Sequence, residues 1–166
     1  MKRFLLFFLA LLLFSPAVYG KENKVVAYLD GKPITYSELK AYAEMLPGDK
    51  YKKMLENREG LKKLLNYYID RLIILEEAKK EIKTPERVFR AHSSLDKDSA
   101  YIIAYLSRKV DGEIEVTEEE VEKYAKERGI EKRLAYAELL SKKRREKFKE
   151  LLRALRKKHK IKFLVR

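Results

Sequence analysis

The chain has no cysteine, no tryptophan and no glutamine, and it has only two histidines among its 166 residues. Without cysteine it forms no disulfide, offers no thiol nucleophile and supplies no thiolate ligand to a metal. The histidines, His92 and His159, are far apart in the sequence and show no metal-ligand spacing. The glycines occur singly, so there is no glycine-rich phosphate loop. We therefore expect no cofactor, no bound metal, no catalytic residues and no enzymatic activity.

Long apolar runs are missing except near the N-terminus. Lys2 and Arg3 precede an unbroken apolar stretch at residues 4–14, and a short segment follows up to Gly20. This three-part order is typical of a secretory signal peptide. Eleven residues in a helix extend about 16 Å at ~1.5 Å per residue, whereas a membrane core is roughly 30 Å thick. The sequence predicts cleavage after Gly20, and retention of residues 1–20 as a membrane anchor is the alternative.

Residues 21–166 are long enough for a single domain with one hydrophobic core. Because disulfides are excluded, the folded state must be stabilised by packing and by charge. The whole sequence contains 26 lysines and 20 glutamates, a bias that is typical of proteins from very hot habitats. We therefore expect a thermophilic source.

The net charge of +13 is concentrated at the C-terminal end. Residues 141–166 carry thirteen lysines and arginines against two glutamates, while residues 21–140 are neutral overall. A basic tail is typical of proteins that bind nucleic acid or an anionic membrane. The acidic segment 113–127, with seven glutamates, offers an intramolecular partner instead. We favour intramolecular pairing, since export argues against nucleic acid as a partner, and weak contact with an anionic membrane surface stays open.

The chain after Gly20 opens with a predicted β-hairpin. Residues 25–29 are mostly β-branched or aromatic, Asp30-Gly31 is a two-residue turn signal, and residues 32–34 resume the extended pattern. A closing stretch within residues 160–165 alternates apolar and polar side chains, which indicates a strand. Because a two-stranded hairpin alone is marginal in water, we expect this stretch to pair with residues 25–29.

Between these strands the pattern is helical, and two capping boxes, Thr35-x-x-Glu38 and Thr117-x-x-Glu120, each start a helix. The expected helices cover residues 35–46, 51–82, 85–89, 98–110, 121–128 and 131–158. In the last one, apolar residues at both ends, Leu134 and Leu155 among them, are expected to pack around an exposed charged middle. The predicted fold class is mainly α, a single helical domain with a small antiparallel β element formed by the N-terminal hairpin and the C-terminal strand.

Four segments in this order resemble the chaperone part of the SurA and PrsA family of exported peptidyl-prolyl isomerases. They are residues 25–35 (VVAYLDGKPIT), 64–80 (LLNYYIDRLIILEEAKK), 116–124 (VTEEEVEKY) and 151–161, which ends in RKKHKI. They are similar, respectively, to the family's opening strand and turn, its central helix, the helix that leads toward the isomerase domain, and its final helix and strand. The resemblance implies a SurA N-terminal-like helical chaperone domain over residues 21–166.

The family's isomerase module has no counterpart here. A parvulin-type domain, on the order of 100 residues like an ordinary domain, usually stands between the last two matched segments. In this chain only residues 125–150 separate them, and their pattern is helical. The resemblance therefore implies a chaperone without prolyl isomerase activity.

The function that the resemblance implies is that of a periplasmic or otherwise exported holdase, whose partners are unfolded or outer-membrane-bound polypeptides. Such a protein needs an apolar concavity of adaptable side chains, and tyrosine combines an apolar face with a polar tip. The candidate client-binding residues are Tyr67, Tyr68, Tyr101, Ile102 and Tyr105. Ordinary core packing is the alternative for all five.

Two other functions stay open. An envelope interaction or assembly module would dock on a folded partner or an anionic surface through the basic helix at residues 142–160. A degenerate isomerase that keeps its activity by other means is the third. Salt separates the first two hypotheses, because ionic strength weakens surface charge contacts and does not weaken apolar burial.

Overall fold

The computed structural model describes residues 24–90 and 92–165, so the predicted signal peptide at residues 1–20 lies outside the described residues. The described chain forms six α-helices and one three-stranded antiparallel sheet. This confirms the mainly α fold class with a small β element. Within the same residues, no helix combines the length and the apolar character needed to cross a membrane.

The sheet is built from the two ends of the described chain. Its strands are β1 (Val25–Leu29), β2 (Lys32–Thr35) and β3 (Ile161–Phe163), in the order β2-β1-β3. Asp30 and Gly31 have φ angles of +50° and +79°, as a type I′ hairpin turn requires. The pairing of β3 with β1 confirms the predicted closure, although β3 is shorter than expected and lies at the edge of the sheet.

The turn residue Asp30 also joins the hairpin to the segment before β3. Its carboxylate accepts hydrogen bonds from the His159 ring at 2.6 Å and from the backbone N–H of Lys160 at 2.7 Å. The His159 contact, and then the Lys160 contact, hold the pKa of Asp30 below its ordinary value of 3.8. Ionised Asp30 therefore favours the folded state.

We expect the Asp30 contacts to make unfolding pH-dependent. Since the pKa is lower in the folded state, the stabilisation is complete above about pH 3.8 and is lost as the pH falls through the folded pKa. In the Asp30→Asn variant, Tm should fall less steeply as the pH is lowered through this acidic range. Circular dichroism measures Tm, with a chelator present so that no metal ion contributes. An unchanged acid profile in Asp30→Asn would show that this carboxylate does not contribute to it.

Six α-helices connect the hairpin to β3. They are α1 (Tyr36–Met45), α2 (Lys50–Lys53), α3 (Arg58–Glu81), α4 (Ser94–Lys109), α5 (Glu118–Arg128) and α6 (Lys132–Arg156), with 3-10 turns at Met54–Glu56, Glu86–Arg90 and Asp111–Glu113. Both predicted capping boxes form, at Thr35 and at Thr117. The largest differences from the expected boundaries are before α3 and before α4. In addition, α5 begins at Glu118, three residues earlier than expected, α6 ends at Arg156, two residues earlier than expected, and the helix expected at residues 85–89 is a 3-10 turn.

The predicted helix at 51–82 is in fact α2, a 3-10 turn and α3, and Asn57 marks the break. Asn57 has extended backbone and its side chain accepts a hydrogen bond from the Gly60 N–H at 2.8 Å. Ser93 acts in the same way for α4, since its hydroxyl accepts from the Asp96 N–H at 3.1 Å. This cap starts α4 at Ser94, earlier than the expected residue 98.

Gly60 allows the chain before α3 to pass close to the helix. A Cβ at this position would lie 2.6 Å from the Met54 carbonyl oxygen and 2.7 Å from its Cα, both backbone atoms. We expect Gly60→Ala to destabilise the fold by about 1–3 kcal/mol, because the backbone must move, and to lower Tm by several degrees. Gly112→Ala is the control, since its nearest atom lies at 3.4 Å. Equal thermal melts for the two variants would contradict this reading of Gly60.

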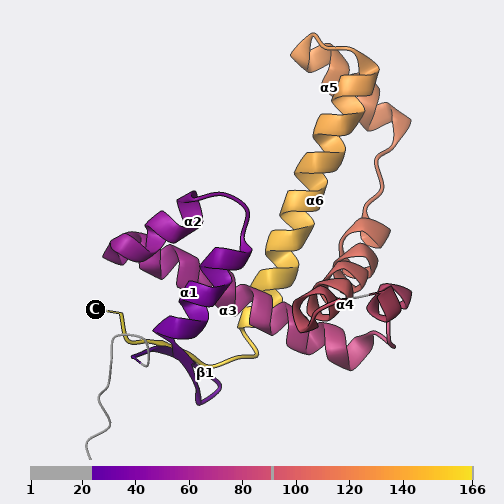
Figure 1. The fold of residues 1–166 in the computed structure, drawn as a ribbon. Coiled ribbons are helices and arrows are strands. Elements are labelled where there is room, and N and C mark those ends of the chain that lie inside the picture. Colours follow the sequence, from indigo (N-terminus) through magenta and orange to yellow (C-terminus); the bar gives the residue numbers. More distant parts are fainter. Residues whose placement is uncertain (1–23, 91, 166) are drawn as a thin grey trace, which may run out of the picture.

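The helices form a body and a projecting arm (Figure 1). The central helix α3 crosses the body, and α1, α2 and α4 lie around it, while α6 rises out of the body and carries α5 at its far end. The main core includes Leu64, Leu65, Ile69 and Ile73 of α3, all fully buried. Their burial confirms that the segment predicted as central is the middle of the fold.

The arm has a small core of its own, and it corrects one expectation. Val121 and Ala125 of α5 pack against Ala135 and Leu139 of α6. Leu134, which was predicted to pack, is 50% exposed. The reason is that α5 covers the face of α6 that carries Ala135, the next residue, and this leaves Leu134 on the uncovered side.

Ion pairs tie the basic helix to the acidic segment, as favoured from the sequence. Lys143 lies 2.6 Å from Glu120, Lys147 lies 2.6 Å from Glu113, and Arg144 lies 2.6 Å from Asp111. These hydrogen bonds lower the pKa values of the two glutamates. The pairs are partly exposed to solvent, so they set the position of residues 111–120 against α6 more than they stabilise the fold.

Candidate functional site

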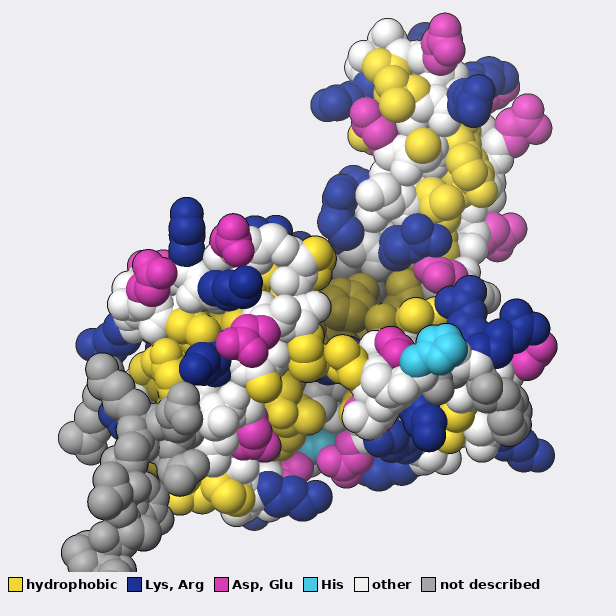
Figure 2. All heavy atoms as spheres, in the orientation of Figure 1, with side chains coloured by type: hydrophobic (Ala, Val, Ile, Leu, Met, Phe, Trp, Pro, Cys, Tyr) yellow, Lys and Arg dark blue, Asp and Glu magenta, His cyan; other side chains and the backbone are white. Residues whose placement is uncertain are grey.

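A groove lies where α6 leaves the body. Its volume is about 430 Å³, and side chains from α1, α2, α3, α4 and α6 line it. Figure 2 shows the hollow between the body and the arm, with hydrophobic side chains on its walls. The aliphatic and phenyl groups of this wall are Leu46, Ile74, Ile102, Leu106, Phe148 and Leu152. We call this hollow the arm groove.

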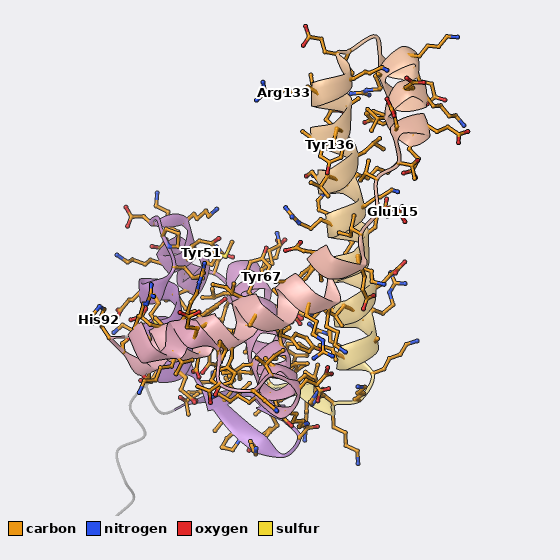
Figure 3. The ribbon with its side chains drawn as sticks, turned by 90° about the vertical axis from the view of Figure 1, so that its right-hand side faces the viewer. Tyr51, Tyr67, His92, Glu115, Arg133 and Tyr136 are labelled. Carbon is orange, nitrogen blue, oxygen red and sulfur yellow. The ribbon has the colours of Figure 1, made fainter. Side chains whose placement is uncertain are left out.

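Three tyrosines, Tyr42, Tyr51 and Tyr67, complete the lining of the arm groove. In Figure 3, Tyr51 and Tyr67 lie near each other on the body, whereas Tyr136 lies on the arm. Tyr67 is 48% exposed, so its ring is available to a ligand without any rearrangement of the core. Each ring offers apolar area and a hydroxyl that can bond to a polar neighbour.

The polar side chains of the arm groove are Asp70 and Arg71 of α3. Burial raises the pKa of Asp70, and its ion pair with Arg156 partly offsets the rise. Arg156 also donates a hydrogen bond to the Asn66 side chain at 2.9 Å. The Nη2 atom of Arg71 is buried and has no hydrogen-bond partner among the described residues. Because this atom is buried, a ligand could accept from it only after the arginine side chain moves.

The structure brings together only part of the predicted client-binding set. Tyr67 and Ile102 line the arm groove. The Tyr68 ring packs against the Tyr42 ring in a tilted arrangement with centroids 5.0 Å apart, and Tyr68 lines a different cavity, beside the hairpin. Tyr101 is half-buried against the main core. Tyr105 is 1% exposed and belongs to the core, where burial raises its pKa to about 12.

Sequence reasoning missed the wall contributed by α6. Phe148 and Leu152 stand four residues apart, which places them on one helical face, directly after a charged run. That spacing was the available signal. Tyr51, Leu46 and Arg71 had no comparable signal, because their place in the arm groove depends on how α1 and α2 pack on α3.

Further apolar side chains lie on the arm, on the same face of α6 as the groove wall but separated from it by the exposed Ser141 and Arg145. Leu134 precedes Leu152 by 18 residues, which is five turns at ~3.6 residues per turn, so the two side chains lie on the same face of α6. Ala137 stands on this face as well, and it is exposed. The face left open by α5 therefore carries a second, separate apolar patch, and Leu134 lies roughly 27 Å from Leu152 at ~1.5 Å per residue.

No protein-family model matches this chain, and no curated protein matches it. The resemblance to the SurA and PrsA family thus stays a prediction that depends on four sequence segments.

Proposed function

We propose that this protein is an exported holdase that binds apolar segments of unfolded polypeptides in the arm groove. The observation that carries the proposal is an open, largely apolar groove of about 430 Å³ whose walls come from the body and from α6. Its volume falls within the range of roughly 300–1,000 Å³ that is common for ligand sites in proteins. The occupant is an extended or partly folded segment rich in apolar side chains.

The chemistry of the walls suits many different clients. Tyrosine rings such as Tyr67 contact apolar side chains of varied shape at a low cost in conformational entropy. The tyrosine hydroxyl groups can bond to a polar group of the client, which would otherwise lose its hydrogen bond to water. The affinity of these contacts depends on the apolar area that is buried and not on a particular client sequence, as a holdase requires.

Aggregation of a chemically unfolded outer-membrane protein after dilution tests the proposal, with light scattering as the readout. The protein should suppress aggregation when present in about equimolar amount, and equally well from low salt to about 0.5 M, because apolar burial is not screened. Suppression that disappears at high salt, or no suppression at any ratio, would contradict binding in the arm groove.

The basic face of α6 supports a second candidate, docking on an anionic envelope surface. Lys142, Lys149 and Lys157 form no ion pair with any residue that the structure describes. Cosedimentation with vesicles that contain anionic lipid measures this function directly. Salt-sensitive vesicle binding together with failure to protect a client would favour the docking role over the holdase.

We also propose that the protein lacks prolyl isomerase activity. The segment that separates the last two matched regions, residues 125–150, lies in the end of α5, a short link and α6. A protease-coupled peptide assay should give no rate above the uncatalysed background. Turnover well above that background, with contaminating isomerases removed, would be the contrary result.

A further inference from the structure

Three residues from distant parts of the sequence meet beside the sheet. Asp30 belongs to the β1–β2 turn, Glu76 to α3, and His159 to the link between α6 and β3. One possible ligand atom of each residue lies within 4.8 Å of those of the other two. We propose that these three side chains form a binding site for a divalent transition-metal ion such as Zn²⁺.

His159 supplies the strongest observation. Its side chain is 6% exposed, and its Nδ1 lies 2.6 Å from the Asp30 carboxylate. Nδ1 and this carboxylate oxygen therefore already lie side by side, and an ion bound to both takes the place of the hydrogen between them. A neutral imidazole that carries its proton on Nε2 keeps a lone pair on Nδ1 for the ion.

The two carboxylates are placed to complete the site. Asp30 is held by the Lys160 N–H at 2.7 Å, so it needs little reorganisation to bind an ion. Asp30 and Glu76 both line a cavity of about 330 Å³, which provides a path for the ion and room for water ligands. One imidazole and two carboxylates together suit Zn²⁺ and similar ions better than Mg²⁺ or Ca²⁺, which prefer oxygen ligands alone.

Lys80 is the cation that an incoming metal must displace. Its Nζ lies 2.9 Å from a Glu76 oxygen and also 2.9 Å from a Glu77 oxygen. When Glu76 turns toward the ion, Lys80 keeps its ion pair with Glu77. The exchange therefore leaves no ammonium group without a partner. A bound ion would join the hairpin, α3 and the segment before β3, and would therefore stabilise the closure of the sheet.

Metal binding can be measured on untagged protein that has been freed of metal with a chelator. Isothermal titration with Zn²⁺ should show one ion per chain, and Tm should rise by roughly 5–10 °C at a hundredfold excess over the Kd. Co²⁺ should give the visible absorption of a site with a nitrogen ligand. His159→Ala should abolish binding, and Glu76→Gln should weaken it at least tenfold, whereas His92→Ala, which removes an exposed histidine, should leave it unchanged.

The Glu76→Gln variant distinguishes a loss of metal binding from a folding defect, because it keeps the contact between Asp30 and His159. Circular dichroism and Tm without metal establish that each variant is folded. The proposal is overturned if the wild type binds no Zn²⁺ or Co²⁺, if Glu76→Gln binds as tightly as the wild type, or if His92→Ala loses as much affinity as His159→Ala.

Discussion

Deletion of the chain from Lys160 onward should lower the free energy of unfolding by several kcal/mol. The deletion removes β3 and two flanking hydrogen bonds, from the Asp30 N–H to the Lys160 carbonyl and from the Leu164 N–H to the Val26 carbonyl, each 2.9 Å long. It also uncovers the core beside β1, because Ile161 and Phe163 pack there. Ladder bonds contribute ~1 kcal/mol each and fully buried apolar side chains ~1.5–3 kcal/mol each. Chemical denaturation measures the loss.

Leu164 offers a matched pair that separates backbone pairing from side-chain packing. Leu164→Pro removes the N–H that bonds to Val26, whereas Leu164→Ala keeps it, and both variants lose the leucine side chain, which is 37% exposed. We expect the proline variant to be clearly less stable than the alanine variant. If the full deletion shifts Tm by less than about 2 °C, which is under ~1 kcal/mol for a chain of this size, then β3 does not stabilise the fold.

Replacement of Tyr67 by glutamate should reduce client binding at least tenfold. The new carboxylate would lie in the arm groove, where an apolar client would have to remove it from water without providing a partner. Because Tyr67 is 48% exposed, the substitution should leave Tm nearly unchanged. Binding of an unfolded client is measured by fluorescence anisotropy of a labelled apolar peptide, and protection by the aggregation assay.

Tyr136→Glu is the matched control. Tyr136 is 47% exposed, and it lies on the arm rather than in the arm groove, as Figure 3 shows. Its position is 16 residues before Leu152, which places it about 160° away round the helix axis. The two variants thus have the same charge and similar exposure. Equal loss of client binding in both would show that general surface charge, and not the groove, governs binding.

Local signals in the sequence were sufficient for most helix starts and for the hairpin. The capping boxes at Thr35 and Thr117 and the turn at Asp30 depend on residues within three positions of one another, so tertiary context does not alter them. The breaks at Asn57 and Ser93 depend on equally local caps, yet they were not recognised, since the flanking residues also fit a helical pattern.

Opposite charges on residues 113–127 and on the basic helix were enough to favour their pairing, and an unpaired hairpin was enough to require a third strand. Both inferences follow from the free-energy cost of leaving charged side chains or strand backbone groups without partners. This cost can be recognised from the sequence before the fold is known. Neither of them specifies where the partners meet. The sequence could not place Tyr105 in the core and Tyr67 on a groove wall, because both occur at helical spacing on apolar faces.

By itself, then, the sequence determined most of the elements, their order and the closure of the sheet, because these depend on neighbouring residues and on the pairing of unsatisfied strands. Only the tertiary structure decided the sites. The arm groove exists because α6 leaves the body and α5 covers one face of it while leaving Leu134 open. Asp30, Glu76 and His159 meet because the sheet closes against α3. Such juxtapositions depend on how helices cross, which no pattern within a single helix encodes.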